Sequence, residues 1–314
     1  MLCCYHPTTT VAIDDDVNFL NVLTEHSGVA DCIGYQCPHK AIDALQNKNP
    51  FESILSRVLI NDHDMVCKTN IHQLHEEIYS EKRFNAVSVI IVDYYMDAMN
   101  GIDVCEKLAH HPAKKILLTG GNDKEKIAVE AFNKGIIHQF VNKADPKFPI
   151  LLKQKIKQLQ IAYFKDLTTQ LLPSNHMINS VIENPNYQKI FQHIQSSIKE
   201  YYLLDNFGSY LFLAENGKPT WLVIKHKSDI DDFVNLTLHQ DGEHAWIKIL
   251  SHYKKIPFFF TEEDFQQPVE VWHEYLHPAN PIKGLNDYYY AVIDGHVKNN
   301  INHKNLISQN SRRK

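Results

Sequence analysis

The stretch Ser88-Val-Ile-Ile-Val-Asp93, followed by Tyr94-Tyr-Met-Asp-Ala-Met-Asn-Gly101, decides how this chain folds. Its run of branched apolar residues, bounded by residues that favour turns, is typical of a strand buried on both faces of a parallel sheet. Open α/β sheets place their ligands beyond the carboxyl ends of such strands. We therefore expect Asp93 to lie in a crevice on a rigid support.

Three other short apolar runs also end in polar residues. They are Val11-Ala-Ile before Asp14-Asp15-Asp16, Ile116-Leu-Leu before Thr119-Gly120, and Gln139-Phe140-Val-Asn before Lys143. Each run is predicted to be a strand. An acidic triplet alone would say little, because most such runs are solvated loop charges. Four strands that end in chemically useful side chains indicate one shared site.

An acidic pair, an aspartate, a threonine and a lysine, in this order and each at a strand end, resemble the receiver domain of bacterial two-component response regulators. The resemblance covers about residues 9–160 and includes Met96, Met99 and Gly101. It implies an α/β fold with a doubly wound, five-stranded parallel sheet of the flavodoxin-like kind.

The resemblance also implies a role for each site residue. A carboxylate can accept a phosphoryl group, and a divalent cation with oxygen ligands removes the charge repulsion between the two anions. Asp93 would be phosphorylated by a sensor histidine kinase. The expected Mg²⁺ ligands are Asp14, acting through water, Asp15, Asp93 and the backbone carbonyl of Tyr95; the expected phosphate-binding and switch residues are Thr119, Lys143 and Phe140. Such a receiver catalyses only its own phosphorylation and dephosphorylation.

Three neighbouring positions carry further expectations. Asp16 is expected to face solvent or to cap the first helix. Phe140 is either a moving switch or a fixed core residue. Lys143 is followed by Ala144, where the family usually has a cis proline; a cis bond here would be costly, and the sequence leaves open whether the bond is cis or trans. The ring of Tyr95 is expected to shield the phosphoryl group and to slow its hydrolysis.

The region between Asp15 and Asp93 is longer than a compact receiver needs, since the two residues are 78 positions apart (93 − 15). Apolar residues at helical spacing in 49–60 and 71–84 predict a helical insertion over about 47–84, or a lengthened second helix and its return. The insertion is either a packed addition or a surface for a partner or a second copy. A helical pattern from Phe148 to Leu172 predicts a long helix whose apolar stripe favours a homodimer.

The chain length of 314 residues favours two domains. We expect a receiver domain over 1–160, a helical linker over 161–186, a smaller α+β output domain over 187–297 and a polar tail over 298–314. The output domain is predicted to begin with a helix over 187–204. A hairpin over 209–224, turning at Asn216-Gly217, and a strand over 287–293 follow.

Composition indicates where the protein works. Six cysteines without a Cys-x-x-Cys pair favour reduced thiols. The first ten residues lack the apolar segment of a signal peptide, and no run is long enough to cross a membrane. We therefore expect a soluble, cytoplasmic protein without a membrane partner.

The output domain carries weaker signals. From Ser174 it has 14 Lys and Arg against 16 Asp and Glu, so DNA binding is possible but not favoured. A module that binds a protein or a small ligand is preferred; the alternatives are an atypical transcriptional regulator and an enzyme with hydrolase or nucleotide chemistry.

Two motifs in the output domain are open to interpretation. The stretch His273-Glu-Tyr-Leu-His277 matches a zinc-protease pattern, but Pro278 disfavours the helix that this pattern requires. Tyr288, Tyr289 and Tyr290 indicate a strand with core rings on one face and hydroxyls on the other, or a small-ligand pocket.

Overall fold

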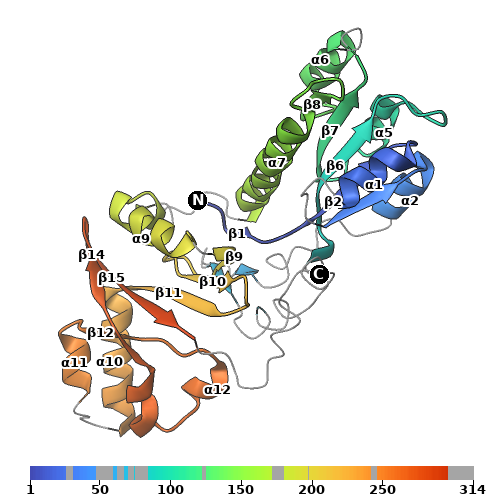
Figure 1. The fold of residues 1–314 in the computed structure, drawn as a ribbon. Helices are drawn as coiled ribbons and strands as arrows, with labels where there is room; N and C mark the ends of the chain where they lie inside the picture. Colours follow the sequence, from blue (N-terminus) through green and yellow to red (C-terminus); the bar gives the residue numbers. More distant parts are fainter. Residues whose placement is uncertain are drawn as a thin grey trace.

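The computed structural model consists of two lobes connected by the long helix α7 (Figure 1). It describes residues 1–25, 31–46, 59–61, 67–69, 74, 84–121, 125–171, 180–196, 198–241 and 246–295. One lobe is built on a parallel sheet and the other on an antiparallel sheet. Among the described residues, no helix is both long and apolar enough to span a membrane.

The first lobe contains a five-stranded parallel sheet. Its strands are β2 (Thr9–Ile13), β3 (Cys32–Tyr35), β6 (Val87–Asp93), β7 (Lys114–Thr119) and β8 (Gln139–Asn142). Their order is β3-β2-β6-β7-β8, with β6 in the centre and every residue of β6 buried. This order confirms the predicted doubly wound fold.

Helices cover both faces of this sheet. Apolar residues of α2 (Pro38–Gln46), α5 (Gly101–Lys107) and α6 (Glu125–Asn133) share one core with Ile90 and Val92 of β6. Residues of α1 (Val17–Glu25) and α7 (Phe148–Leu171) share a second core with Val89 and Ile91. The alternation along β6 shows that burial on both faces, and not an amphipathic pattern, explains its continuous apolar run.

The insertion differs in part from the prediction. Its described residues include an antiparallel pair formed by β4 (Leu59–Asn61) and β5 (Cys67–Thr69), whereas a helix was predicted to reach residue 60. Short apolar runs fit helix and strand alike, so spacing alone could not separate the two. Most of the two predicted helical segments lies outside the described residues.

The second lobe contains a six-stranded antiparallel sheet. Its order is β1 (Cys4–Tyr5), β9 (Ile198–Leu203), β10 (Tyr210–Ala214), β11 (Pro219–His226), β15 (Leu285–Asp294) and β14 (Asn280–Ile282). The predicted boundary of the first domain at residue 1 is therefore wrong, because Cys4 pairs with Tyr202 and Tyr5 with Tyr201. The chain begins in the second lobe and then crosses to the first.

The helix predicted over 187–204 is also only partly correct. Helix α9 (Pro185–Gln195) begins after the cap Asn184, whose side chain accepts hydrogen bonds from Asn186 and Tyr187. It ends before β9, in which Tyr201 and Tyr202 are buried between β1 and β10. Aromatic residues fit a pleated, half-covered surface well, and tertiary pairing overrode the helical spacing.

The remaining elements follow the predicted hairpin of β10 and β11, which turns at Gly217 with a φ of 77°. They are α10 (Lys227–Asp241), α11 (Ile247–Ser251), β12 (Lys255–Pro257), α12 (Glu262–Phe265), the 3-10 helix η3 (Val269–Tyr275) and β13 (Leu276–Pro278). The predicted strand with three tyrosines is β15.

His273 lies in η3 and His277 in β13, so the zinc-protease pattern is not carried on one α-helix.

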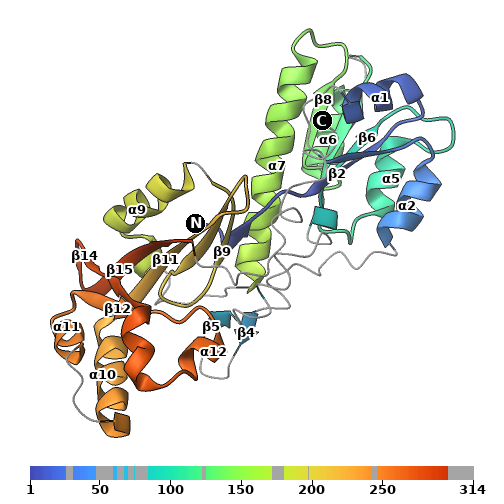
Figure 2. The same ribbon diagram turned by 60° about the horizontal axis from the view of Figure 1, so that its bottom comes forward.

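Helix α7 belongs to both lobes. Leu152, Ile156 and Leu159 pack in the core of the first lobe, whereas Tyr163, Phe164 and Leu167 pack in the core of the second. In the residue after Leu167, the hydroxyl oxygen of Thr168 accepts a hydrogen bond from the Cys3 amide at 3.0 Å. Two segments therefore connect the lobes: helix α7, and the residues between β1 and β2, which run in the opposite chain direction (Figure 2).

Candidate functional site

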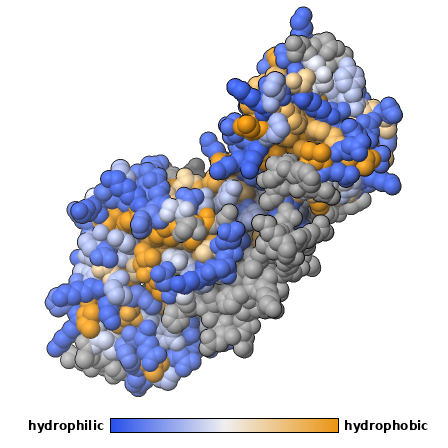
Figure 3. Space-filling view, viewed as in Figure 1, coloured by the Kyte–Doolittle hydropathy of each residue, from blue (hydrophilic) through white to orange (hydrophobic). Residues whose placement is uncertain are grey.

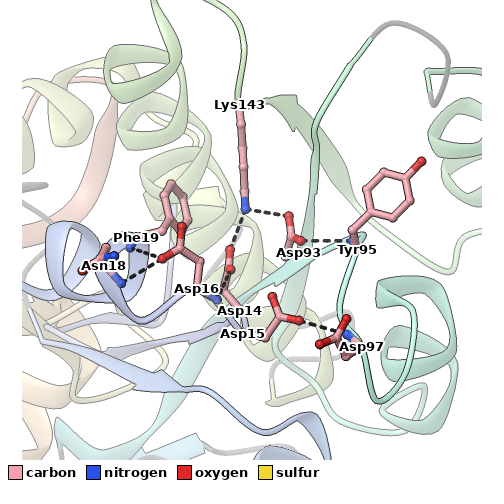
Figure 4. A network of polar contacts seen from close by, with 9 residues as sticks. All are labelled: Asp14, Asp15, Asp16, Asn18, Phe19, Asp93, Tyr95, Asp97 and Lys143. Carbon is pink, nitrogen blue, oxygen red and sulfur yellow. Dashed lines mark hydrogen bonds and ion pairs between the residues drawn. The ribbon is translucent and has the colours of Figure 1, made fainter.

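The predicted site residues lie at one edge of the parallel sheet. Asp14 follows β2, Asp93 ends β6, Thr119 ends β7 and Lys143 follows β8. Because these strands are parallel and adjacent, their carboxyl ends meet at the same edge. Figure 4 shows Asp14 and Asp15, which follow β2, converging with Asp93 at the end of β6 and Lys143 after β8.

Three carboxylates form the acidic part of the site. Ligand oxygens of Asp14, Asp15 and Asp93 all lie within 4.8 Å of one another, and among the described residues this is the one His, Cys, Asp and Glu cluster with metal-ligand spacing. Backbone amides hold them in place, since Asp14 accepts from the Asp16 amide at 3.0 Å and Asp15 from the Asp97 amide at 2.9 Å. Such an oxygen cluster is suited to a hard divalent cation.

Lys143 lies between two of these carboxylates. Its Nζ is 2.6 Å from Oδ2 of Asp14 and 2.7 Å from Oδ1 of Asp93, and 4.2 Å from the centre of the Phe19 ring. Burial lowers the pKa of Lys143, but its hydrogen bonds to Asp14 and Asp93 outweigh burial and raise the pKa overall. The ammonium is therefore held in its charged form beside Asp93.

Asp93 is buried, with 6% of its surface exposed. Burial raises its pKa; hydrogen bonding and charge attraction from Lys143 oppose this shift, and the nearby Asp14 charge adds to it. Its second oxygen, Oδ2, accepts a hydrogen bond from the Tyr95 amide at 3.0 Å. The carboxylate is thus fixed at both oxygens, and its pKa is raised overall because burial outweighs the attraction of Lys143.

Thr119 and Phe140 occupy the positions predicted for a switch. The Thr119 hydroxyl is fully buried and has no hydrogen-bond partner within the described part of the chain. A buried hydroxyl without a partner is costly, so it would gain from an incoming oxyanion. Phe140 is half-buried against the core beneath the site, and this position is compatible with either of its predicted roles.

The loop after Asp93 returns closely onto the strand. Asn100 caps α5 by accepting hydrogen bonds from the amides of Ile102 and Asp103, and the Gly101 amide donates to the Tyr94 carbonyl at 3.0 Å. A Cβ atom at Gly101 would lie 2.2 Å from the carbonyl oxygen of Asp93. Glycine is therefore needed here for close approach of two backbones.

The structure also resolves the smaller expectations. Asp16 caps α1, because its Oδ1 accepts from the amides of Asn18 and Phe19. The Lys143–Ala144 bond is trans. The Tyr95 ring is 54% exposed and points away from Asp93, so the expected shielding has no support in this arrangement (Figure 4).

Two contributors were missed from the sequence. Phe19 contacts the Lys143 ammonium through its ring, and Asp97 donates its amide to Asp15. Phe19 lies near the start of a helix and Asp97 in a turn, and neither residue type at such a position indicates a role in the site. Only the distance of Asp97 from Asp93 along the chain could have indicated that it lies near the site.

Comparisons with known proteins agree with this geometry. The family model described as the response regulator receiver domain matches residues 46–147, a region that contains Asp93, Thr119 and Lys143 and begins after Asp14 and Asp15. No curated protein matches the chain.

Among solved structures, the Legionella pneumophila response regulator LqsR is similar over 99% of this chain and 95% of its own, with 27% identity and a TM-score of 0.70. The receiver domain of a putative LuxO repressor from Vibrio parahaemolyticus covers 51% of this chain and 96% of its own, with 16% identity and a TM-score of 0.34. The family match thus spans β6, β7 and β8 of the parallel sheet and leaves β2 and β3 outside it.

Proposed function

We propose that this protein is a two-component response regulator that is phosphorylated on Asp93 by a sensor histidine kinase. The observation that supports this most directly is the convergence of Asp14, Asp15, Asp93 and Lys143 beside a buried Thr119 hydroxyl without a described partner. A carboxylate, a cation site, a fixed ammonium and an unused donor are the groups that transfer of a phosphoryl group to an aspartate requires.

Each residue has a separate role in this proposal. One carboxylate oxygen of Asp93 forms the bond to phosphorus, and the donor group leaves with the electron pair of the bond that breaks. Asp14, Asp15, Asp93 and the Tyr95 carbonyl would hold Mg²⁺, which neutralises negative charge when bound. Lys143 exchanges its contacts with the carboxylates for a phosphoryl oxygen, and the Thr119 hydroxyl donates to another.

The change at Thr119 would be transmitted through Phe140 and the adjoining α6 and α7 surfaces. Because α7 packs in both cores, a shift of this helix would reach the second lobe directly. We propose that the second lobe is the output domain and binds a downstream protein or a small ligand.

The cation site can be tested by the Mg²⁺ dependence of labelling with acetyl phosphate. We expect Asp15→Asn to raise the Mg²⁺ concentration needed for half-maximal labelling by at least about tenfold, the size that even outer-shell changes cause in metal sites. Asp16→Asn is the matched control, because asparagine also caps helices well. Equal Mg²⁺ dependence in wild type and Asp15→Asn would contradict the assignment.

We also propose that phosphorylation favours a homodimer. Exposed apolar side chains lie on α6 and α7, namely Val129, Phe132, Ile150 and Ile161, and Figure 3 shows apolar residues at the surface of the upper lobe. Ile150 is 62% exposed. Isolated exposed residues are common, but four of them on the two helices that flank the edge strand β8 favour an interface.

Light scattering of the phosphorylated protein tests this proposal. Wild type is expected to have the mass of a dimer, and Ile150→Glu that of a monomer. Lys153→Glu alters charge on the same helix and should remain dimeric. A wild-type monomer with and without phosphorylation would exclude the proposal.

A further inference from the structure

A polar cavity lies at the end of the parallel sheet opposite Asp93. It has a volume of about 450 Å³ and is bordered by the segment after α5, the first residues of β7, the turn between α6 and β8, and the last part of α7. Lys114 and Lys115 begin the strand that ends in Thr119. The cavity is therefore separated from the candidate phosphorylation site by the length of β7.

Basic side chains outnumber acidic ones at this cavity. Its basic side chains are Lys114, Lys115, Lys134, His110, His111 and His138, and its acidic side chains are Glu106 and Asp166. Lys114 forms an ion pair with Asp166 of α7. A group of basic side chains around a concave space favours an anion in that space.

Lys115 is the least compensated of these groups. Only 3% of its surface is exposed, and it has no hydrogen-bond or ion-pair partner among the residues that the structure describes. Burial lowers its pKa; the nearby Cys105 opposes this shift, and the neighbouring Lys114 charge adds to it. Its ammonium nitrogen is not among the fully buried polar atoms without a partner, so it reaches the open space of the cavity, where an anion would supply a partner.

Two imidazoles add oriented donors. Nδ1 of His111 accepts a hydrogen bond from the Ala113 amide, and Nδ1 of His138 accepts one from the Lys115 amide, both at 3.1 Å. Because Nδ1 is the acceptor, the proton of each neutral ring is on Nε2. Burial, followed by the nearby lysines, lowers the pKa of each histidine to about 4, so both rings are neutral donors at pH 7.

A metal ion fits this cavity poorly. Both Nδ1 atoms already accept backbone hydrogen bonds, and Lys114 and Lys115 repel cations. Within the described ranges, metal-ligand spacing occurs at Asp14, Asp15 and Asp93 and not among the histidines here. A ligand rich in acceptor oxygens matches a cavity lined by lysines and by imidazoles whose Nε2 atoms carry the proton.

We propose that this cavity binds a small anion carrying a phosphate group, with Lys115 and Lys134 as its charged partners. Its volume falls in the usual range for small-molecule sites, about 300–1,000 Å³. A bound phosphate would compete with Asp166 for Lys114. Since Asp166 lies on the helix shared by both lobes, occupancy would weaken a contact between α7 and the sheet. The proposal does not depend on phosphorylation of Asp93.

Calorimetric titration of the full chain with inorganic pyrophosphate, in EDTA so that no cation fills the acidic site, tests the proposal. Wild type should bind one equivalent saturably. Lys115→Met should bind at least about tenfold more weakly, since a hydrogen bond to a charged group commonly contributes that much. Asp166→Asn should bind more tightly, because it frees Lys114.

Lys107→Met is the matched control, because this lysine is exposed on α5, does not border the cavity and is expected to leave affinity unchanged. Circular dichroism checks the fold of each variant. If Lys115→Met does not fold, Lys134→Met at the exposed rim must show the loss instead. No saturable binding by wild type, or equal losses in the Lys115 and Lys107 variants, would overturn the proposal.

Discussion

Asp93→Asn is expected to abolish labelling by acetyl phosphate and to leave the fold intact. The amide keeps the shape of the side chain and its hydrogen bond from the Tyr95 amide but is a very poor nucleophile. It also removes one of three crowded carboxylates, while Lys143 keeps Asp14 as its partner. We therefore expect labelling to fall to background and the unfolding midpoint to change little.

Mass spectrometry of the labelled protein measures the first effect, and circular dichroism the second. Asp97→Asn is the control, because Asp97 lies on the same loop with its side chain exposed and contributes only its backbone amide to the site. It should be labelled normally. Full labelling of the Asp93→Asn protein would mean that another residue is the acceptor or that the receiver signals without phosphorylation.

The positions of the site residues could be predicted because they follow from two simple inferences about the strands. A continuous apolar run predicts a buried parallel strand, and parallel order brings the residues after each strand to one edge. Asp14, Asp93 and Lys143 obey this rule and meet. Their pairing did not follow from the sequence, since it depends on the length and direction of the Lys143 side chain.

The second lobe was harder to predict for a physical reason. Strand β1 has two residues and pairs with β9, almost 200 positions later, so no local pattern marks it. In β9 the apolar spacing fitted a helix, and only the neighbouring strands decide otherwise. Contacts distant in sequence determined both elements.

Lysines at the start of β7 illustrate a further limit. The predicted strand began at Ile116, yet β7 also includes Lys114 and Lys115, which are both buried. A cavity and Asp166 of a distant helix surround them. The two lysines that depart from the apolar pattern of β7 therefore line a polar cavity at the end of the sheet opposite Asp93.

Gly101→Ala is expected to destabilise the receiver and to slow labelling together. The added Cβ would lie 2.2 Å from the Asp93 carbonyl oxygen and 2.9 Å from a methyl carbon of Leu117. Alanine favours a helix over glycine by about 1 kcal/mol. Overpacking costs about 1–3 kcal/mol and sometimes more, and a backbone atom cannot move aside as a side-chain end can. The clash should therefore outweigh the helical gain.

Urea unfolding and the rate of acetyl phosphate labelling measure these effects. We expect a loss of roughly 2 kcal/mol in stability, the difference between a clash at the upper end of that range and the helical gain. Labelling should slow because β6 or α5 must shift, and Asp93 moves with β6. Gly120→Ala is the matched control, since a Cβ there meets no atom within 4 Å. Equal stability and labelling in the two variants would show that close approach at Gly101 does not hold β6 and Asp93 in place.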